Sequence, residues 1–178
     1  LLPALRSEFP DHAIIVRPHP AENQDTWREV TSSIENVHVV HENNVTEWIQ
    51  AADVMVHSNC TTGVESFLLD VPCIAYQPVS SVHYDTYLPN ALSWCAATGE
   101  EVVNLVKQCI EDSTLQVQTA ERMKEARDYI TAIDGAFSCE EMVDHLCGLD
   151  VRTSGPELTA LEKTGRLGKE MLPMLKRV

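Results

Sequence analysis

The sequence predicts an α/β protein whose core is a doubly wound parallel sheet. Two observations carry this prediction. Short apolar runs alternate with longer amphipathic runs over residues 12–76, with short connections, and polar residues cluster where the apolar runs end. Parallel strands joined by right-handed helical crossovers have this organisation, and their ligand-binding side chains lie at the carboxyl ends of the strands.

Each apolar run predicts a strand and each amphipathic run a helix. After a short helix ending near Phe9, strands are predicted at residues 12–16, 36–40, 53–57 and 71–76, with helices between them at 24–34, 44–52 and 61–70. The run "AIIV" in the first strand indicates burial on both faces. Thr46 is the expected cap of helix 44–52.

The chain beyond the fourth strand is predicted to be irregular at first and then helical. Residues 77–93 contain two prolines and have no clear periodicity, whereas helices are predicted at 99–112, 116–133 and 137–148. Residues 149–178 are polar and contain glycine and proline, so we expect a mobile tail with at most a short helix near 157–163. The folded domain is therefore expected to span residues 1–148.

The composition restricts the partners. Lys and Arg total 13 against 27 Asp and Glu, a net charge of -14 that repels nucleic acid and anionic lipid. We therefore expect no nucleic-acid partner and at most peripheral membrane association. A small anion is still compatible with this charge, because the amides at a helix start bind it locally.

The cysteines and the first residues bear on location and completeness. The 6 cysteines show no CxxC spacing, which favours a reducing, cytoplasmic location, with the inner face of the cytoplasmic membrane as an alternative. The chain opens "LLPALRSEF" without an initiator Met, so a fragment of a longer protein is expected.

Three polar loops follow the first three predicted strands and mark one edge of the expected sheet. They are Arg17–Pro20, His41–Asn44 and Ser58–Thr62. Prolines 18 and 20 disfavour helical conformations at the residues before them, so the first loop leaves the sheet extended, with Arg17 and His19 directed to the crevice. The alternative is a simple strand terminator with exposed side chains.

The stretch "HSNCTTGVE", residues 57–65, predicts a phosphate site. A strand there runs into small polar residues and then into a helix whose free N–H groups and threonine hydroxyls can bind a phosphate. Glu65, one turn further on, can accept both hydroxyls of an attached ribose. The alternative is that Ser58 or Thr61 only caps the helix and Glu65 only complements its dipole.

Taken together, "RPHP", "ADVMVHSNCTTGVESFLLDVPCIAYQP" and "YLPNALS" resemble the C-terminal, Rossmann-like, nucleotide-binding half of GT-B glycosyltransferases, specifically bacterial proteins of capsule and lipopolysaccharide synthesis. The resemblance covers about residues 12–147. It departs from the family at Asp70, where many relatives carry glycine in a turn.

The resemblance implies a set of site residues. Arg17 and His19 would stabilise the departing nucleotide, as the catalytic groups of this half. The nucleotide would be bound by the remaining candidates, which are His41, Ser58, Asn59, Thr61, Thr62 and Glu65. His41 lies where relatives bind the base through the main chain, so its side chain is a weaker candidate.

The implied activity is transfer of a sugar from a CMP- or CDP-linked donor to a saccharide acceptor. The catalytic base would come from a missing N-terminal domain of the same protein. The 7 histidines show no metal-binding spacing, and no metal or bound cofactor is expected. The alternatives are a UDP-sugar 2-epimerase, which usually shows "SGG" followed by glutamates, and a non-catalytic interaction domain that retains the fold.

Overall fold

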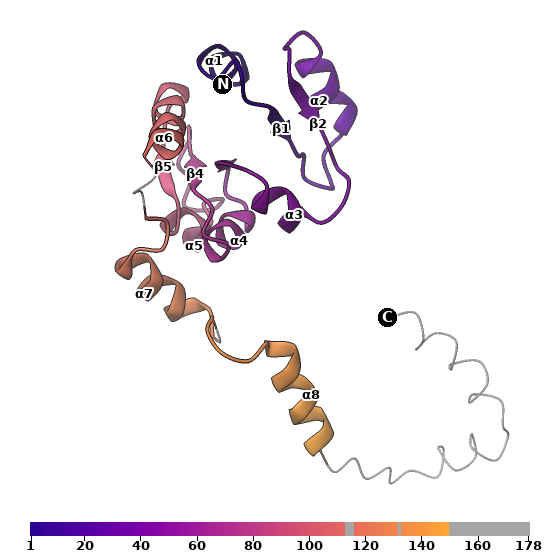
Figure 1. Ribbon diagram of the computed structural model, residues 1–178, viewed down its shortest axis with the longest axis vertical. Helices are drawn as coiled ribbons and strands as arrows, with labels where there is room; N and C mark the ends of the chain where they lie inside the picture. The colour runs from indigo at the N-terminus through magenta and orange to yellow at the C-terminus, as the bar shows by residue number, and fades with distance from the viewer. Residues whose placement is uncertain (113–115, 132, 150–178) are drawn as a thin grey trace, which may run out of the picture. The chain divides into compact units, whose positions relative to one another are not determined.

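The computed structural model describes residues 1–112, 116–131 and 133–149. Over these ranges the chain forms short parallel strands and helices in α/β order, shown in Figure 1. It divides into two compact units, Leu1–Ile133 and Asp134–Val178. All the strands of the described residues lie in the first unit.

The predicted strands are all present but shorter than expected. The strands are β1 (Ile14–Val16), β2 (Val37–Val39), β3 (Met55–His57), β4 (Cys73–Tyr76) and β5 (Trp94–Ala96). The helices are α1 (Leu2–Glu8), α2 (Gln24–Thr31), α3 (Val45–Gln50), α4 (Thr62–Leu68), α5 (Tyr87–Ala91), α6 (Gly99–Glu111), α7 (Ala120–Tyr129) and α8 (Ser138–Gly148). Two elements were missed by the sequence reading: α5 and β5.

The prediction of one continuous sheet is wrong. The strands form two parallel sheets, β1–β2 and β3–β4–β5. No described segment lies between β1 and β3 to continue the hydrogen-bonded ladder, so each sheet ends in an open edge at that point. The class, α/β with parallel strands and flanking helices, is as predicted.

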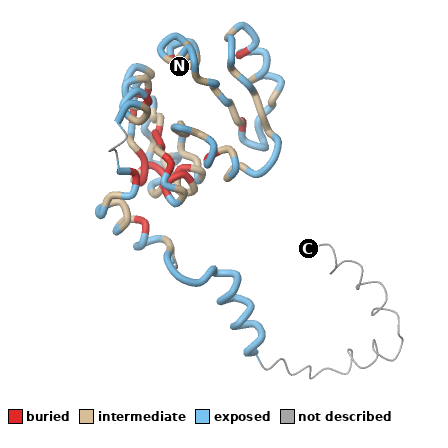
Figure 2. Tube along the Cα trace, viewed as in Figure 1, coloured by how far each residue is buried: buried red, intermediate tan, exposed pale blue. Residues whose placement is uncertain are grey.

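The core gathers around β4 and β5. One cluster joins α1, β4, β5 and α6 through the buried residues Leu5, Ile74, Ala96, Val102 and Val106. A second joins α4, α5 and α7 through Phe67, Leu92 and Ala126, with Val117 before α7. Because helices α4 and α6 both pack on β4, Cys73, Ile74 and Ala75 are fully buried, and Figure 2 shows this concentration of buried residues.

Local polar groups define the helix ends. Asn44, and not the predicted Thr46, caps α3: its side chain accepts the N–H of Thr46 at 3.2 Å. Thr98 and Glu101 form a reciprocal capping box at the start of α6. These caps satisfy donors that a helix start otherwise leaves without partners.

The end of α4 contains Asp70, where the family that the sequence resembles often has glycine. Asp70 has φ +58°, and the N–H groups of Asp70 and Val71 donate to the carbonyls of Phe67 and Ser66. This is the double hydrogen bond of a Schellman motif, which requires a left-handed residue at this position. Asp70 therefore occupies a turn conformation that glycine adopts more easily.

The second unit contributes α8 to the described residues. Its side chains are exposed, including Met142, Val143 and Leu146 on one face. The predicted tail, residues 149–178, lies outside the described residues except for Leu149, and so does the short helix expected near 157–163.

Candidate functional site

The connection from β3 to α4 contains most of the predicted nucleotide-binding residues. Ser58 and Thr61 are exposed, and Thr62 and Glu65 are half-buried. Thr61 occupies the N-cap position in a helical conformation, φ -60°, and its side chain makes no capping hydrogen bond. The alternative in which Ser58 or Thr61 serves only as a cap therefore has no hydrogen bond to support it within the described chain.

The start of α4 has unused donors. The N–H groups of Gly63 and Val64 already donate to the carbonyls of Cys60 and Thr61, at 3.0 and 2.9 Å. Within the described part of the chain, neither the N–H groups nor the hydroxyls of Thr61 and Thr62 have a hydrogen-bond partner. Two amides and two hydroxyls of adjacent residues can donate to the oxygens of one phosphate.

A buried histidine at the end of β3 joins the loop that follows β3 to the residue before β5. Nδ1 of His57 accepts the N–H of Cys60 at 3.2 Å, so in the neutral ring Nε2 carries the proton and donates to Oγ of Ser93 at 3.0 Å. Ser93 donates in turn to the carbonyl of Pro89 at 2.7 Å. Burial lowers the pKa of His57 to about 4, which keeps this ring neutral.

Asn59 has a structural role in the same loop. Its Oδ1 accepts the N–H of Thr86 at 3.2 Å and Nδ2 of Asn90 at 2.7 Å, and its own Nδ2 lies 3.4 Å from a carboxylate oxygen of Asp85. Its backbone is left-handed, φ +52°. These contacts occupy the amide that the sequence assigned to a nucleotide, and they hold the loop against the segment that leads into α5.

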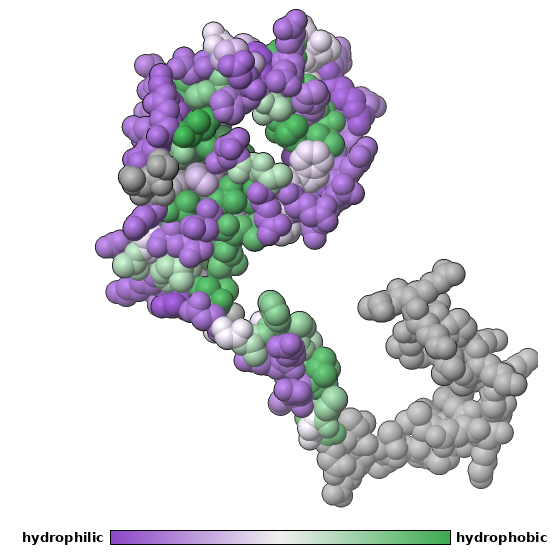
Figure 3. Space-filling model, in the orientation of Figure 1, coloured by the Kyte–Doolittle hydropathy of each residue, from purple (hydrophilic) through white to green (hydrophobic). Residues whose placement is uncertain are grey.

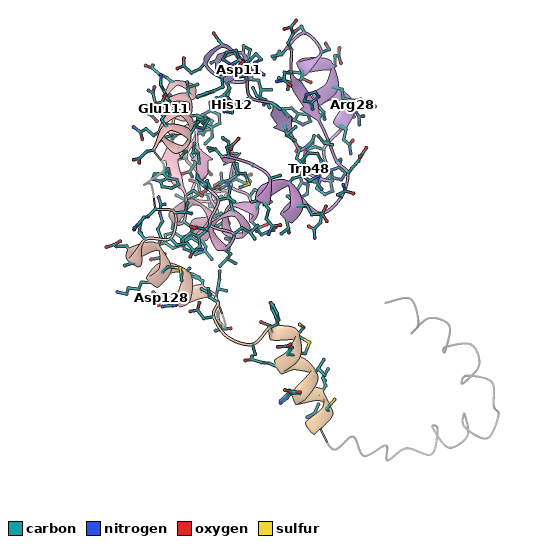
Figure 4. The ribbon with its side chains drawn as sticks, viewed as in Figure 1. Asp11, His12, Arg28, Trp48, Glu111 and Asp128 are labelled. Carbon is teal, nitrogen blue, oxygen red and sulfur yellow. The ribbon has the colours of Figure 1, made fainter. Side chains whose placement is uncertain are left out.

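Arg17 joins the first two loops. Its two terminal nitrogens donate to the carbonyls of Glu42 and Asn43, at 2.8 and 2.7 Å. Trp48 of α3 donates its indole N–H to the same Glu42 carbonyl at 2.8 Å, and Figure 4 shows its position. Pro18, next to Arg17, is buried. The first loop is therefore held in place by the packing of Pro18 as well as by the backbone restriction of its proline ring.

The two candidate histidines differ in their surroundings. His19 is exposed and forms a local turn: its N–H donates to the carboxylate of Glu22 at 2.7 Å, and its Nδ1 accepts the N–H of Ala21 at 3.2 Å. The second ring nitrogen of His19 is then the one left for a ligand. His41 is half-buried, and its Nδ1 is buried without a partner in the described part of the chain.

The hydrogen bonds therefore form two groups. One joins the loops after β1 and β2, and the other joins the loop after β3 to the segment before α5. No hydrogen bond between described residues connects the groups, and the convergence of His19 and Thr61 on one cleft stays a prediction. The surface depression between α1 and the start of α6 contains none of the candidates.

Sequence reading missed the residues that hold the third loop. These are Asp85, Thr86, Asn90 and Ser93, all in or next to the segment predicted to be irregular. They have no periodicity that could identify them. The useful signal was their chemistry, because small hydroxyl, amide and carboxylate side chains in an irregular segment can hydrogen-bond to backbone and side-chain groups of a neighbouring loop.

Among the described residues, no group of three or more His, Cys, Asp and Glu side chains lies close enough together to hold a metal ion. In the same part of the chain, no helix is both long and apolar enough to cross a bilayer. Comparison with family models, with curated proteins and with solved structures finds no significant match.

Proposed function

We propose that the chain is the nucleotide-sugar-binding domain of a GT-B glycosyltransferase that builds a bacterial surface polysaccharide, with a CMP- or CDP-linked donor. The observation that carries the proposal is the start of α4. Four donors of Thr61 and Thr62 lack partners within the described chain, on a loop that His57 and Asn59 hold in place by hydrogen bonds. A site prepared in this way binds an anion without first having to order the loop.

In the proposed reaction, an acceptor hydroxyl attacks the anomeric carbon of the donor. Its proton passes to a base in the N-terminal half, and the bond from the anomeric carbon to the phosphate oxygen breaks with its electron pair on the leaving nucleotide. Thr61, Thr62 and the exposed ring nitrogen of His19 would stabilise that charge. Arg17, which holds the second loop through Glu42 and Asn43, would add positive charge if the loops converge as predicted.

The test is calorimetric titration of the chain with CMP, CDP, UDP, GDP and cytidine. We expect CMP or CDP to bind more tightly than cytidine, because the phosphate supplies the contacts at α4. Changing Thr61 and Thr62 together to Val should weaken nucleotide binding about 5- to 150-fold, the equivalent of about 1–3 kcal/mol for lost donors to a charged oxygen. Cytidine binding should not change.

Thr26→Val is the matched control, because Thr26 is an exposed helical threonine with no hydrogen bond to another described side chain. Equal affinity for CMP and cytidine would contradict a phosphate site at α4. Binding of UDP alone would favour the epimerase, and binding of none of these compounds would favour an interaction domain.

A further inference from the structure

Each of the two sheets of the first unit has an open edge, at β1 in one sheet and at β3 in the other. Ile14 of β1 packs on the same core cluster as Val54 and Val56 beside and within β3. Leu5 of α1 is buried in that cluster, together with Ile74 of β4. Residues of β1 and β3 therefore pack against one core cluster, yet no ladder joins the two strands.

Both open edges present backbone N–H and C=O groups that can pair with a further strand. The N–H of Ile14 donates to the carbonyl of Asn36, and the carbonyl of Val16 accepts from Val40, so these residues face β2. Successive residues of a strand point their backbone groups in opposite directions, so those of Ile15 face the open edge. By the same reasoning Met55, which donates to the carbonyl of Pro72, faces β4, and Val56 faces the open edge.

Burial supports the same conclusion. The apolar run in β1 is typical of a strand covered on both faces, yet Ile15 is 42% exposed. In β4, which has a neighbour on each side, Ile74 is fully buried. In Figure 1 the ribbons of β1 and β4 stand apart, and Figure 3 shows an opening there with apolar surface on both sides.

We propose that one further parallel strand inserts between β1 and β3 and joins the two sheets, and that it is supplied by polypeptide that precedes α1. The insertion would give the order β2–β1–new strand–β3–β4–β5. This is the order of a doubly wound sheet, in which the first strand along the chain is central. In such a sheet, the helix before β1 is a crossover from a parallel strand, and α1 occupies that place.

The inserted strand would change the candidate site as well as the sheet. Its carboxyl end would lie between the loop that follows β1 and the loop that follows β3. Ligands of doubly wound sheets bind where the strand order reverses, next to the central strand. The proposal itself depends only on the two edges, and it stands whether or not the chain binds a nucleotide.

The first measurement uses the chain as it is. Amide hydrogen exchange, followed by NMR, compares Ile15 with Ile14 and Val56 with Met55, since one member of each pair faces the open edge. We expect the edge amides to exchange at least about tenfold faster than their bonded neighbours. Equal protection in the unextended chain would mean that the edges pair with each other or with a second copy, and would overturn the proposal.

The second measurement adds the strand. The chain is extended before Leu1 by about five Val and Ile residues and a Gly/Ser linker of about four residues. We expect the amides of Ile15 and Val56 to become as protected as those of Ile14 and Met55 in a monomeric protein. The matched control carries two consecutive prolines at the middle of the added strand, one facing each edge, which remove a donor to β1 and a donor to β3, disrupt the strand and should abolish the protection.

The proposal would be overturned if the proline extension protected the amides of Ile15 and Val56 as well as the extension without proline does. Protection of these amides only in a dimer would also overturn it. So would a folded extended monomer in which Ile15 and Val56 stay unprotected. Should the extension prevent folding, seen as lost protection of Ile74, the same segment is added as a separate peptide to the unextended chain. Failure of that peptide to protect Ile15 and Val56 overturns the proposal as well.

Discussion

Nε2 of His57 lies 3.0 Å from the hydroxyl of Ser93, and this buried contact connects the end of β3 with the residue before β5. The same ring accepts the N–H of Cys60 in the loop that leads into α4. Both ring nitrogens are therefore used in positioning the start of α4. His57 is better described as a support for the candidate site than as a ligand.

The first prediction concerns pH. The pKa of His57 is about 4 in the folded chain, below its usual 6.5, because burial disfavours the charged ring. On acidification the unfolded chain binds the proton first, so the stabilisation is complete above pH 6.5 and is lost as the pH falls toward 4. At pH 5 the loss should be about 2 kcal/mol.

The measurement is urea unfolding at pH 7 and pH 5 for the parent chain and for His57→Gln. The variant is less stable at pH 7, but it should lose less stability between the two pH values, because glutamine does not titrate. The many carboxylates titrate in both proteins, so the difference between the two proteins in the stability lost from pH 7 to pH 5 isolates the contribution of the histidine. An equal loss in both proteins would show that the ring of His57 is not buried in its neutral form.

The second prediction concerns Gly63 at the start of α4. A Cβ added there would lie 2.7 Å from Nε2 of His57 and 3.1 Å from Cβ of Pro89. The ring is held at both nitrogens and has little freedom to move, so Gly63→Ala should destabilise the chain by about 1–3 kcal/mol. Gly99→Ala is the control, because the nearest atom to its Cβ is Leu1 Cδ1 at 3.9 Å.

Thermal unfolding of both variants tests this expectation. Gly99→Ala should have a melting temperature equal to or above that of the parent, since alanine is favoured over glycine in a helix. A normal melting temperature for Gly63→Ala would mean that the helix start is looser than the His57 contacts indicate.

The third prediction concerns Asn59, for which the structure assigns a support role. Asn59→Gly keeps the left-handed backbone accessible but removes the side-chain contacts to Thr86 and Asn90. The free energy of unfolding should fall by about 1–3 kcal/mol, because the buried amide of Asn90 loses its partner. Urea unfolding measures the change, and a stability equal to that of the parent would instead leave Asn59 available to a ligand.

The fourth prediction separates two roles of Glu65. As a ribose ligand, Glu65→Gln should weaken nucleotide binding, because an amide N–H₂ replaces an oxygen that accepts a hydroxyl. As a partner of the helix dipole only, it should lower stability by about 0.3–1 kcal/mol and leave the affinity unchanged. Melting temperature and nucleotide affinity measured on the same sample decide between the roles.

The fifth prediction concerns the end of α4. Asp70 adopts φ +58° there, a conformation that is costly for residues with a side chain. Asp70→Gly should raise stability by up to about 1 kcal/mol, and chemical denaturation measures the gain. Asp70→Ala is the informative control, since it has a Cβ but not the local hydrogen bonding of aspartate, and it should be less stable than the parent.

The sequence by itself determined the local elements. Apolar runs and their polar ends identified β1 to β4, because alternation between strand and helix depends on neighbours along the chain. The resemblance placed Asp70 in a turn, and the structure shows that its backbone there is left-handed. Strand β5 and helix α5 were missed, because the segment before Trp94 is organised by hydrogen bonds to Asn59 and His57, which are distant in sequence.

Only the tertiary structure decided which strands pair and what each polar side chain does. Local periodicity predicted that β1 and β3 exist, but pairing depends on which strand lies between them, and no pattern within either strand records its neighbour. In the same way, Arg17 and Asn59 looked like ligand-binding groups from their positions after strands. In the structure each bonds to carbonyl or amide groups of a segment that is distant in sequence, because a polar group held at a sheet edge bonds to the partner that the fold brings within reach.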